Sequence, residues 1–285
     1  MMLSMAGFVF NDTLMKLVST DLSFFQAILV RGIFATSFMT LLCAYMGAFK
    51  VEGGIFNALR HPTVVLRTLG EAGGTYFFLS ALFEMPIANV TAVLQLLPLT
   101  ITLGAALFFG ESVGWRRYGA ILVGFLGVLL IIKPGTDGFN YFAVYAVIST
   151  LFITMRDLVT RKMPRTTPSL LVSLVTAIAI ALMGAIGSAF EPWQPVSPYH
   201  LAVLSGAAAI LTVGYIFSIL AMRDGEVSFV SPFRYSILIW ALLLGYFIFG
   251  DVPDTISMIG AVIIVGSGLF TFYRERLVAR NLETS

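Results

Sequence analysis

Charged side chains within long apolar stretches are the residues of this chain best suited to bind a ligand. On insertion scales, a charge at the centre of a membrane helix costs about 2.5–3.5 kcal/mol, so one that is retained usually faces a cavity or a partner. Arg31, Glu71 and Arg234 each lie inside such a stretch, from which a side chain cannot easily reach water by snorkelling. We therefore expect these three residues to line a central polar path.

Amide and tyrosine side chains extend this candidate site. Asn11 and Asp12 fall well within the first apolar stretch and Gln95 within the fourth. Tyr76 and Tyr215 occupy interior positions where their rings could stack on a planar substrate, although helix packing is the alternative role for most aromatic residues. The predicted substrate-binding set is Asn11, Asp12, Arg31, Glu71, Tyr76, Gln95, Tyr215, Arg234 and Tyr235.

Two of the charge pairs also have a purely structural interpretation. Asp12 with Lys16, and Arg67 with Glu71, are spaced i to i+4, so each pair could neutralise itself on one helix face. For these pairs the structural and functional interpretations carry equal weight. Because Glu71 is a carboxylate within an apolar stretch, coupling of transport to protons is left open.

Arg156 and Asp157, near the end of the sixth apolar stretch, are expected to have a simpler role. They closely precede Arg161 and Lys162, and such a cluster of charges is typical of the point where a helix leaves the membrane. We interpret this pair as a marker of the inner membrane interface.

The sequence lacks the patterns of an enzyme or a metal site. Both histidines, His61 and His200, fall at loop or helix ends, and no Ser–His, paired-Asp or His–Glu cluster stands at catalytic spacing. The single cysteine, Cys43, cannot form a disulfide or a cysteine metal cluster within one chain. No G-x-x-x-x-G-K-[ST] sequence is present. We predict a protein that is not an enzyme, with no catalytic residue, metal or cofactor, and expect gradients to drive any transport.

Composition places these residues in a membrane protein. Of the 285 residues, 58% are hydrophobic and only 11% are charged, which is too few charges to cover a water-soluble globule of this size. Lipid is therefore an expected partner. The net charge of +2 is small and the basic residues lie in short loops, so nucleic acid is not an expected partner.

The apolar stretches predict an all-α integral membrane protein with ten transmembrane helices. The predicted spans are 2–19, 23–46, 64–84, 87–109, 116–132, 140–159, 169–189, 200–221, 228–249 and 255–273. Continuously apolar runs of this length exclude the alternating pattern of barrel strands.

The two halves of the sequence resemble each other. The run 76–82, leading to Phe109-Gly-Glu111, is matched by the run 215–221, leading to Phe249-Gly-Asp251. A weaker match links two charged residues of each half: Asp12 and Lys16, and Asp157 and Arg161. We therefore predict two five-helix repeats, residues 1–135 and 136–285. Five crossings per half make the repeats inverted, which is an architecture suited to alternating access.

Prolines and glycines indicate how the helices meet. Gln95 and Tyr235 fall opposite each other when the halves are aligned, and Pro98 and Pro232 are expected to loosen the backbone nearby. Six glycines predict close contacts of the fifth and tenth helices, as a scaffold or dimer face: Gly119, Gly124, Gly127, Gly260, Gly266 and Gly268. Monomer and homodimer both remain open.

Loop charges predict the orientation. With both termini in the cytoplasm, the inner loops and tail carry most of the basic residues, and Lys133 is the one clearly outside. The inner residues are Lys50, Arg60, Arg116, Arg117, Arg161, Lys162, Arg165, Arg223, Arg274, Arg276 and Arg280.

The segment from Ala81 to Glu111 reads Ala-Leu…Pro-Ile-Ala-Asn-Val…Leu-Pro-Leu…Leu-Phe-Phe-Gly-Glu, and Trp115-Arg-Arg…Lys133-Pro-Gly follows it. These residues resemble the drug/metabolite transporter superfamily, EamA type, over essentially the whole chain. The resemblance implies ten helices in a bacterial inner membrane, with cytoplasmic termini. It also implies import or export of a small-molecule substrate, and a non-transporting membrane scaffold is the alternative from another class.

Asn11-Asp12, Arg67 to Glu71, Thr91 to Gln95 and Arg156-Asp157 are similar to a proteobacterial group of this superfamily. That group includes riboflavin transporters and relatives proposed to carry S-adenosylmethionine. Riboflavin, planar and uncharged, would suit aromatic stacking and the amides. S-adenosylmethionine, an amino acid or another amine would instead suit the carboxylates. The sequence leaves these alternatives open.

Overall fold

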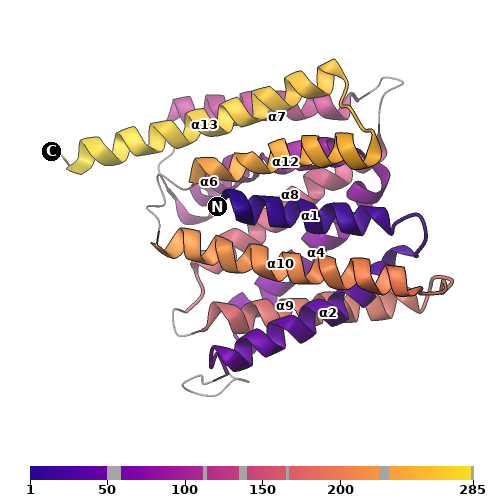
Figure 1. The fold of residues 1–285 in the computed structure, drawn as a ribbon. Coiled ribbons are helices and arrows are strands. Elements are labelled where there is room, and N and C mark those ends of the chain that lie inside the picture. Colours follow the sequence, from indigo (N-terminus) through magenta and orange to yellow (C-terminus); the bar gives the residue numbers. More distant parts are fainter. Residues whose placement is uncertain (50–58, 112–113, 135–139, 165–166, 225–230, 284–285) are drawn as a thin grey trace.

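The computed structural model describes residues 1–49, 59–111, 114–134, 140–164, 167–224 and 231–283, and this part of the chain contains helices and turns but no strand (Figure 1). Lys50, Arg165 and the predicted boundary between residues 135 and 136 lie outside it. The elements are α1 (Met2–Leu17), α2 (Phe24–Tyr45), α4 (Pro62–Glu84), α5 (Ile87–Leu94), α6 (Leu97–Phe109), α7 (Trp115–Ile132), α8 (Tyr141–Arg161), α9 (Ser169–Ser188), α10 (Pro198–Asp224), η1 (Ser231–Tyr235), α12 (Ser236–Leu244), η2 (Gly245–Phe249) and α13 (Thr255–Glu283).

Within the described residues, seven segments are long and apolar enough to cross a membrane. They are α2, residues 87–109 (α5 with α6), α7, α8, α9, the first 20 residues of α10 and the first 20 of α13. The remaining segments are α1, with 16 residues, α4, which carries Arg67 and Glu71, and a shorter apolar helix over 233–249. The expectation of an all-helical membrane protein with many spans is confirmed.

The predicted spans match the observed helices closely, with two informative differences. The span 87–109 is divided at Gln95 and Leu96 because Pro98 has no N–H to donate to the carbonyl of residue 94. Likewise residues 231–249, the described part of the span 228–249, form η1, α12 and η2, so the loosened backbone expected near the two prolines is present. Helix α13 extends ten residues beyond the predicted end at 273, because hydropathy marks the end of an apolar segment rather than the end of a helix.

Close backbone contacts join two helix pairs. A Cβ atom on Gly260 of α13 would stand 2.5 Å from the Gly127 carbonyl oxygen of α7, so the two backbones touch there. A Cβ atom on Gly184 of α9 would stand 2.6 Å from the Leu29 nitrogen of α2. Small residues permit this approach, which drives helix association in lipid. Gly127 and Gly260 thus form a scaffold contact within the chain. The prediction of a scaffold contact is wrong for Gly119 and Gly266, because no atom of another described element lies within 4 Å of a Cβ atom placed on either of them.

The centre of the bundle brings together helices that are far apart in the sequence. Helix α1 packs against α10 and α12, whereas α4 packs against α8 and α9 (Figure 1). Val9, Leu82 and Leu204 are fully buried in one apolar cluster, which joins α1, α4 and α10. Because this cluster fixes the helices against one another, the polar side chains that they carry also meet in the interior.

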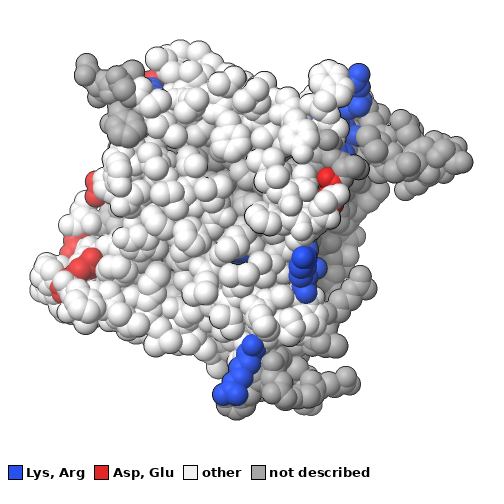
Figure 2. Space-filling model, turned by 180° about the vertical axis from the view of Figure 1, so that it is seen from behind, with Lys and Arg blue, Asp and Glu red and all other residues white. Residues whose placement is uncertain are grey.

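Charges divide between the two ends of the bundle. The two chain termini lie toward the same end, on the left of Figure 1. In Figure 2, which is turned by 180°, Lys and Arg gather toward this end and Asp and Glu mainly toward the other. At the ends of the helices, the first side carries mainly basic residues, with Glu111 beside Arg161, and the second mainly acidic residues, with Lys16 beside Asp251 and Lys133 beside Asp254. The basic residues of the first side are Arg60, Arg116, Arg117, Arg161 and Lys162, and the acidic residues of the second are Asp21, Glu84, Glu191, Asp251 and Asp254.

Candidate substrate-binding site

Asn11 and Asp12 of α1 meet Arg31 of α2 in the interior, where both helices pack against α10. The amide nitrogen of Asn11 donates to Asp12 Oδ1 at 2.9 Å, and Arg31 Nη1 donates to Asn11 Oδ1 at 3.4 Å. Asn11 and Arg31 are buried, and Asp12 is partly buried. A single amide therefore lies between a carboxylate and a guanidinium in the interior.

Arg31 connects this group to two other helices. It interacts electrostatically with Asp12, with Glu71 of α4 and with Tyr215 of α10. The ring of Tyr215 also packs edge-on against Phe8, with 5.3 Å between their centroids. Five of the predicted site residues thus belong to one interior cluster: Asn11, Asp12, Arg31, Glu71 and Tyr215.

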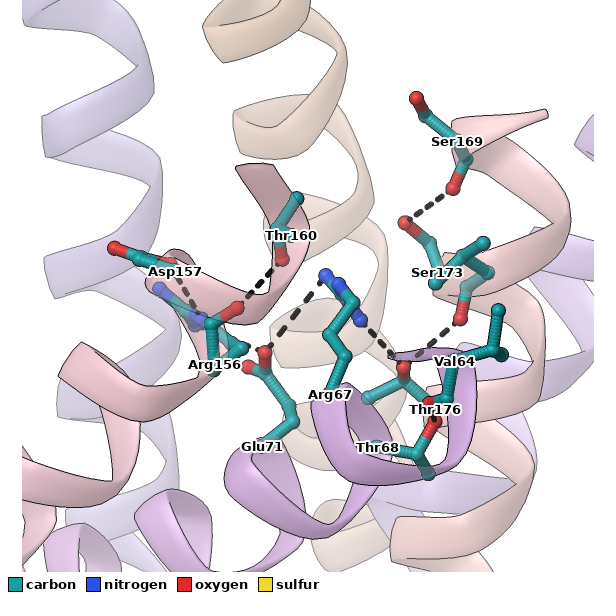
Figure 3. A network of polar contacts seen from close by, with 11 residues as sticks. Val64, Arg67, Thr68, Glu71, Arg156, Asp157, Thr160, Ser169, Ser173 and Thr176 are labelled. Atoms are coloured by element: carbon teal, nitrogen blue, oxygen red, sulfur yellow. Dashed lines mark hydrogen bonds and ion pairs between the residues drawn. The ribbon is translucent and has the colours of Figure 1, made fainter. Parts of the chain in front are cut away.

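A second charged cluster is centred on Glu71 and Arg156, as Figure 3 shows. Arg156 Nη1 lies 2.9 Å from Glu71 Oε2, and its Nε donates to Asp157 Oδ1 at 2.8 Å. Arg67 lies 3.9 Å from Glu71 and donates to Thr176 Oγ1 of α9 at 2.8 Å. The contacts therefore tie α4 to both α8 and α9.

These contacts correct the interpretation of Arg156 as an interface marker. Its side chain is 19% exposed and its close partner is on another helix, so it belongs to the interior network. The i to i+4 spacing of Arg67 and Glu71 predicts only the contact between these two residues. That contact, at 3.9 Å, is longer than the contact of Glu71 with Arg156, at 2.9 Å. Sequence reasoning could have found Asp157 through its match to Asp12, but no local signal points to the pairing of Arg156 with Glu71.

The structure also replaces the expected pair of Asp12 with Lys16. Lys16 donates to the carbonyl of Met85 and lies 3.9 Å from Asp251, at the end of the bundle away from the termini. Asp12 contacts Asn11 instead. Self-neutralisation along α1 is therefore absent among the described contacts.

Arg234 and Tyr235 lie at the end of η1, beside this network. Arg234 interacts electrostatically with Arg156 and Asp157, but its side chain is exposed, unlike that of Arg31. The ring of Tyr235 packs against Gly268 of α13, and its hydroxyl has no hydrogen-bond partner among the described residues. Arg234 is thus placed at the edge of the network and Tyr235 against the α7–α13 scaffold.

Tyr76 and Gln95 are not brought to the charged clusters. Tyr76 belongs to an aromatic group with Phe24, Phe25 and Phe77, whose ring centroids lie 5.1–6.0 Å from its own. Gln95 is buried, and its amide donates to the Thr91 carbonyl one turn earlier at 3.0 Å. Their contacts in the structure are aromatic packing and a local helix bond.

The profile of the EamA-like transporter family matches residues 1–133 and again residues 140–273. An S-adenosylmethionine uptake transporter of Rickettsia felis is 27% identical over 279 residues, covering 96% of this chain and 92% of the relative. A riboflavin transporter of Rhizobium johnstonii is 32% identical over 222 residues, covering 76% of this chain and 70% of the relative.

A solved crystal structure shares the fold, with a TM-score of 0.64 and 19% identity, over 93% of this chain and 94% of that chain. The named relatives are transporters rather than enzymes. The polar interior, the apolar helices and the two profile matches agree, and the chain therefore belongs to the EamA-like transporter family of membrane transport proteins.

Proposed function

We propose that this protein carries a small charged metabolite across the bacterial inner membrane by alternating access. The observation that carries the proposal is the continuous interior network of charges from Asp12 through Arg31 and Glu71 to Arg156. Charged residues are costly in a membrane and are typically retained along substrate pathways. A scaffold protein would have no use for such a network.

Two inverted repeats, residues 1–135 and 136–285, with ten spans in all, are part of the proposal. The helix contacts support it, because the main pairings recur when the halves are exchanged. The contact of α4 with α8 corresponds to that of α10 with α1, and the contact of α6 with α8 corresponds to that of α12 with α1. Helices α2 and α7 pack against their own counterparts, α9 and α13. The basic end of the bundle, which also holds both termini, is the proposed cytoplasmic side.

The proposed substrate is an amino-acid-like or amine-type metabolite, of which S-adenosylmethionine is the leading example. The interior charges around Asn11 and Glu71 support this substrate class, since they can replace the water molecules that solvate a charged ligand. Riboflavin is the second candidate, favoured by the aromatic group around Tyr76 and by the name of the Rhizobium relative. Proton coupling is included in the proposal because Glu71 is a partly buried carboxylate within the network.

Uptake into proteoliposomes tests the proposal. The wild-type protein should accumulate labelled S-adenosylmethionine or riboflavin, and Arg156→Gln should lower the initial rate at least about tenfold because it leaves Glu71 without its closest partner in the interior. The exposed Arg116→Gln removes the same charge at the surface and should transport normally. Thermal melting confirms that each variant is folded.

Two results would count against the proposal. One is a folded wild-type protein that transports neither compound nor any of a panel of amino acids and nucleosides. The other is full uptake by Arg156→Gln. An uptake rate that does not change when a pH gradient is imposed would contradict the proposed coupling of transport to protons.

A further inference from the structure

Building on the proposed transport function, we propose that Asn11, Asp12 and Arg31 bind the α-amino-acid head group of the substrate. Arg31 holds the carboxylate of this group, Asp12 holds its ammonium, and Asn11 keeps the two protein charges at the right separation. The site belongs to α1 and α2, which both pack against α10 in the bundle.

Arg31 is a buried cation with hydrogen-bonding capacity to spare. A guanidinium carries five N–H donors. Arg31 is 6% exposed, its hydrogen bond to Asn11 is 3.4 Å long, and its Nε has no partner among the described residues. A buried donor left unpaired is costly, and the planar fork of Arg matches the two oxygens of a carboxylate. A ligand carboxylate supplies the acceptors that the protein does not.

Asp12 supplies the opposite charge in the same place. Its Oδ1 accepts one hydrogen bond from Asn11, and it interacts electrostatically with Arg31. No Asp12–Arg31 ion pair within 4.0 Å occurs in the described part of the chain, so neither charge neutralises the other directly. A carboxylate accepts up to about four hydrogen bonds, which leaves room for an ammonium group.

Asn11 makes the arrangement specific for a zwitterion. Its amide oxygen accepts from Arg31 and its amide nitrogen donates to Asp12, so it faces each charge with the matching end of its dipole. A ligand that carries an ammonium and a carboxylate on one carbon satisfies both partners at once. Riboflavin has neither group, so this site would not recognise it.

The neighbouring cluster differs in that its charges already satisfy one another. Arg156 contacts Glu71 at 2.9 Å and Asp157 at 2.8 Å, and Arg67 donates to Thr176 at 2.8 Å. None of these side chains has a buried nitrogen or oxygen without a hydrogen-bond partner in the structure as described. The unmatched donor at Arg31 therefore assigns the head group to α1 and α2 rather than to α4 and α8.

The test compares ligands that differ by one group. Binding of S-adenosylmethionine and of decarboxylated S-adenosylmethionine is measured on the purified full-length protein. Wild type should bind the intact compound about 10- to 100-fold more tightly, as is typical of a buried charged hydrogen-bond pair. Arg31→Gln should abolish most of this difference by weakening the intact ligand alone. Asp12→Asn should weaken both ligands similarly, because both keep the amine.

Two further variants separate binding from folding. Arg31→Lys keeps the charge but loses the planar fork, so it should retain an intermediate preference for the intact ligand. Arg67→Gln is the matched control, since Arg67 is another interior arginine of the network but is already paired with Thr176. It should change the affinity of both ligands by the same factor. If Arg31→Gln fails to fold, the relative affinities of wild type and of Arg31→Lys for the intact and the decarboxylated ligand still test the head-group assignment.

The outcomes distinguish this inference from the function on which it rests. Equal binding of the two ligands by wild type, or an undiminished preference in folded Arg31→Gln, would overturn the head-group assignment. Methionine and its decarboxylated amine are compared in the same way. If neither S-adenosylmethionine nor methionine binds while riboflavin is taken up, the head-group assignment is wrong, but the proposed transport function is retained. If no compound of any class is taken up, the proposed function itself fails.

Discussion

The two ends of the bundle use similar charge pairs but bury them to different extents. At the end away from the termini, Lys16 lies 3.9 Å from Asp251 and 5.4 Å from the centre of the Phe249 ring, and it donates to the Met85 carbonyl. The Lys16 and Asp251 side chains are 14% and 31% exposed. These contacts connect the end of α1 to the α4–α5 turn and to the end of η2.

At the end that holds the termini, the corresponding contacts are open to the surroundings. Arg161 lies 3.7 Å from Glu111, and Lys162 lies 4.4 Å from the centre of the Phe109 ring. The Arg161 and Glu111 side chains are 53% and 55% exposed. The acidic partner on each side follows the same Phe-Gly sequence, at 109–111 and 249–251, as expected of a repeat.

The extent of burial, rather than the kind of charge pair, distinguishes the Lys16–Asp251 contact from the Arg161–Glu111 contact. An exposed ion pair contributes about 0–1 kcal/mol, whereas a partly buried cation that also satisfies a carbonyl is screened less and costs more to remove. The end that contains Lys16 is therefore held together more firmly. Under the proposed alternating access, transport requires that the Lys16 contacts break and that those of Arg161 tighten.

The largest effect is expected from Lys16→Met. This change keeps the apolar stem but removes the ion pair and leaves the Met85 carbonyl without its donor, which should lower the free energy of unfolding by about 1–3 kcal/mol. Arg161→Met, the matched variant at the other end, should cost at most about 1 kcal/mol. Unfolding in detergent measures both. Equal losses would show that the two ends do not differ in strength.

A charge exchange tests whether the contact with Asp251 is itself part of the transport cycle. Asp251→Lys places two cations together and should weaken closure at this end, so that uptake falls several-fold. The double variant Lys16→Asp with Asp251→Lys restores opposite charges and should recover part of the uptake. The proteoliposome assay measures both proteins, and a double variant no better than the single one would contradict a paired role.

The smallest effect concerns a neighbouring ion pair at the same end, outside the membrane-spanning segments. Lys133 Nζ lies 2.7 Å from Asp254 Oδ1, and hydrogen bonds from Lys133 and Ser257 lower the pKa of Asp254 from 3.8 to about 2. Because the pKa is lower in the folded protein, the contribution to stability is present above pH 3.8 and is lost as the pH falls through about 2. The Asp254 side chain is 47% exposed, so the change should stay below about 1 kcal/mol.

Asp254→Asn is the variant that checks this prediction. Its unfolding free energy should depend less on pH than that of wild type between pH 4 and pH 2, and the two proteins should converge at the acidic limit of the range. Measurements of unfolding at several pH values give the comparison. A variant with the same pH dependence as wild type would mean that the Lys133 contact does not stabilise the folded state.

Much of the fold could be predicted because a membrane helix depends on the hydrophobicity of consecutive residues. Runs of about 20 apolar residues determine the spans locally, and Pro98 indicates the break between α5 and α6 through its missing N–H. The end of α13 was missed because charged residues can continue a helix after the apolar segment has ended.

The candidate site was predictable only in part. Arg31 and Glu71 are conspicuous because their charges interrupt apolar runs. Arg156 is equally important to the network but stands near other charges, so its local sequence resembles that of a helix end. The structure shows Gln95 in a hydrogen bond to the preceding helix turn and Tyr76 in an aromatic cluster, and their part in substrate binding stays a prediction.

The sequence alone determined the helical membrane class, the position of most helices and the set of costly charges, because each depends on neighbours along the chain. Only the tertiary structure decided which charges meet, because Arg156 contacts Glu71, which is 85 positions away in the sequence, and because the folded bundle leaves Arg31 Nε without a partner among the described residues. The packing of the helices determines which charged residues on different helices become partners, and no local sequence pattern predicts that packing.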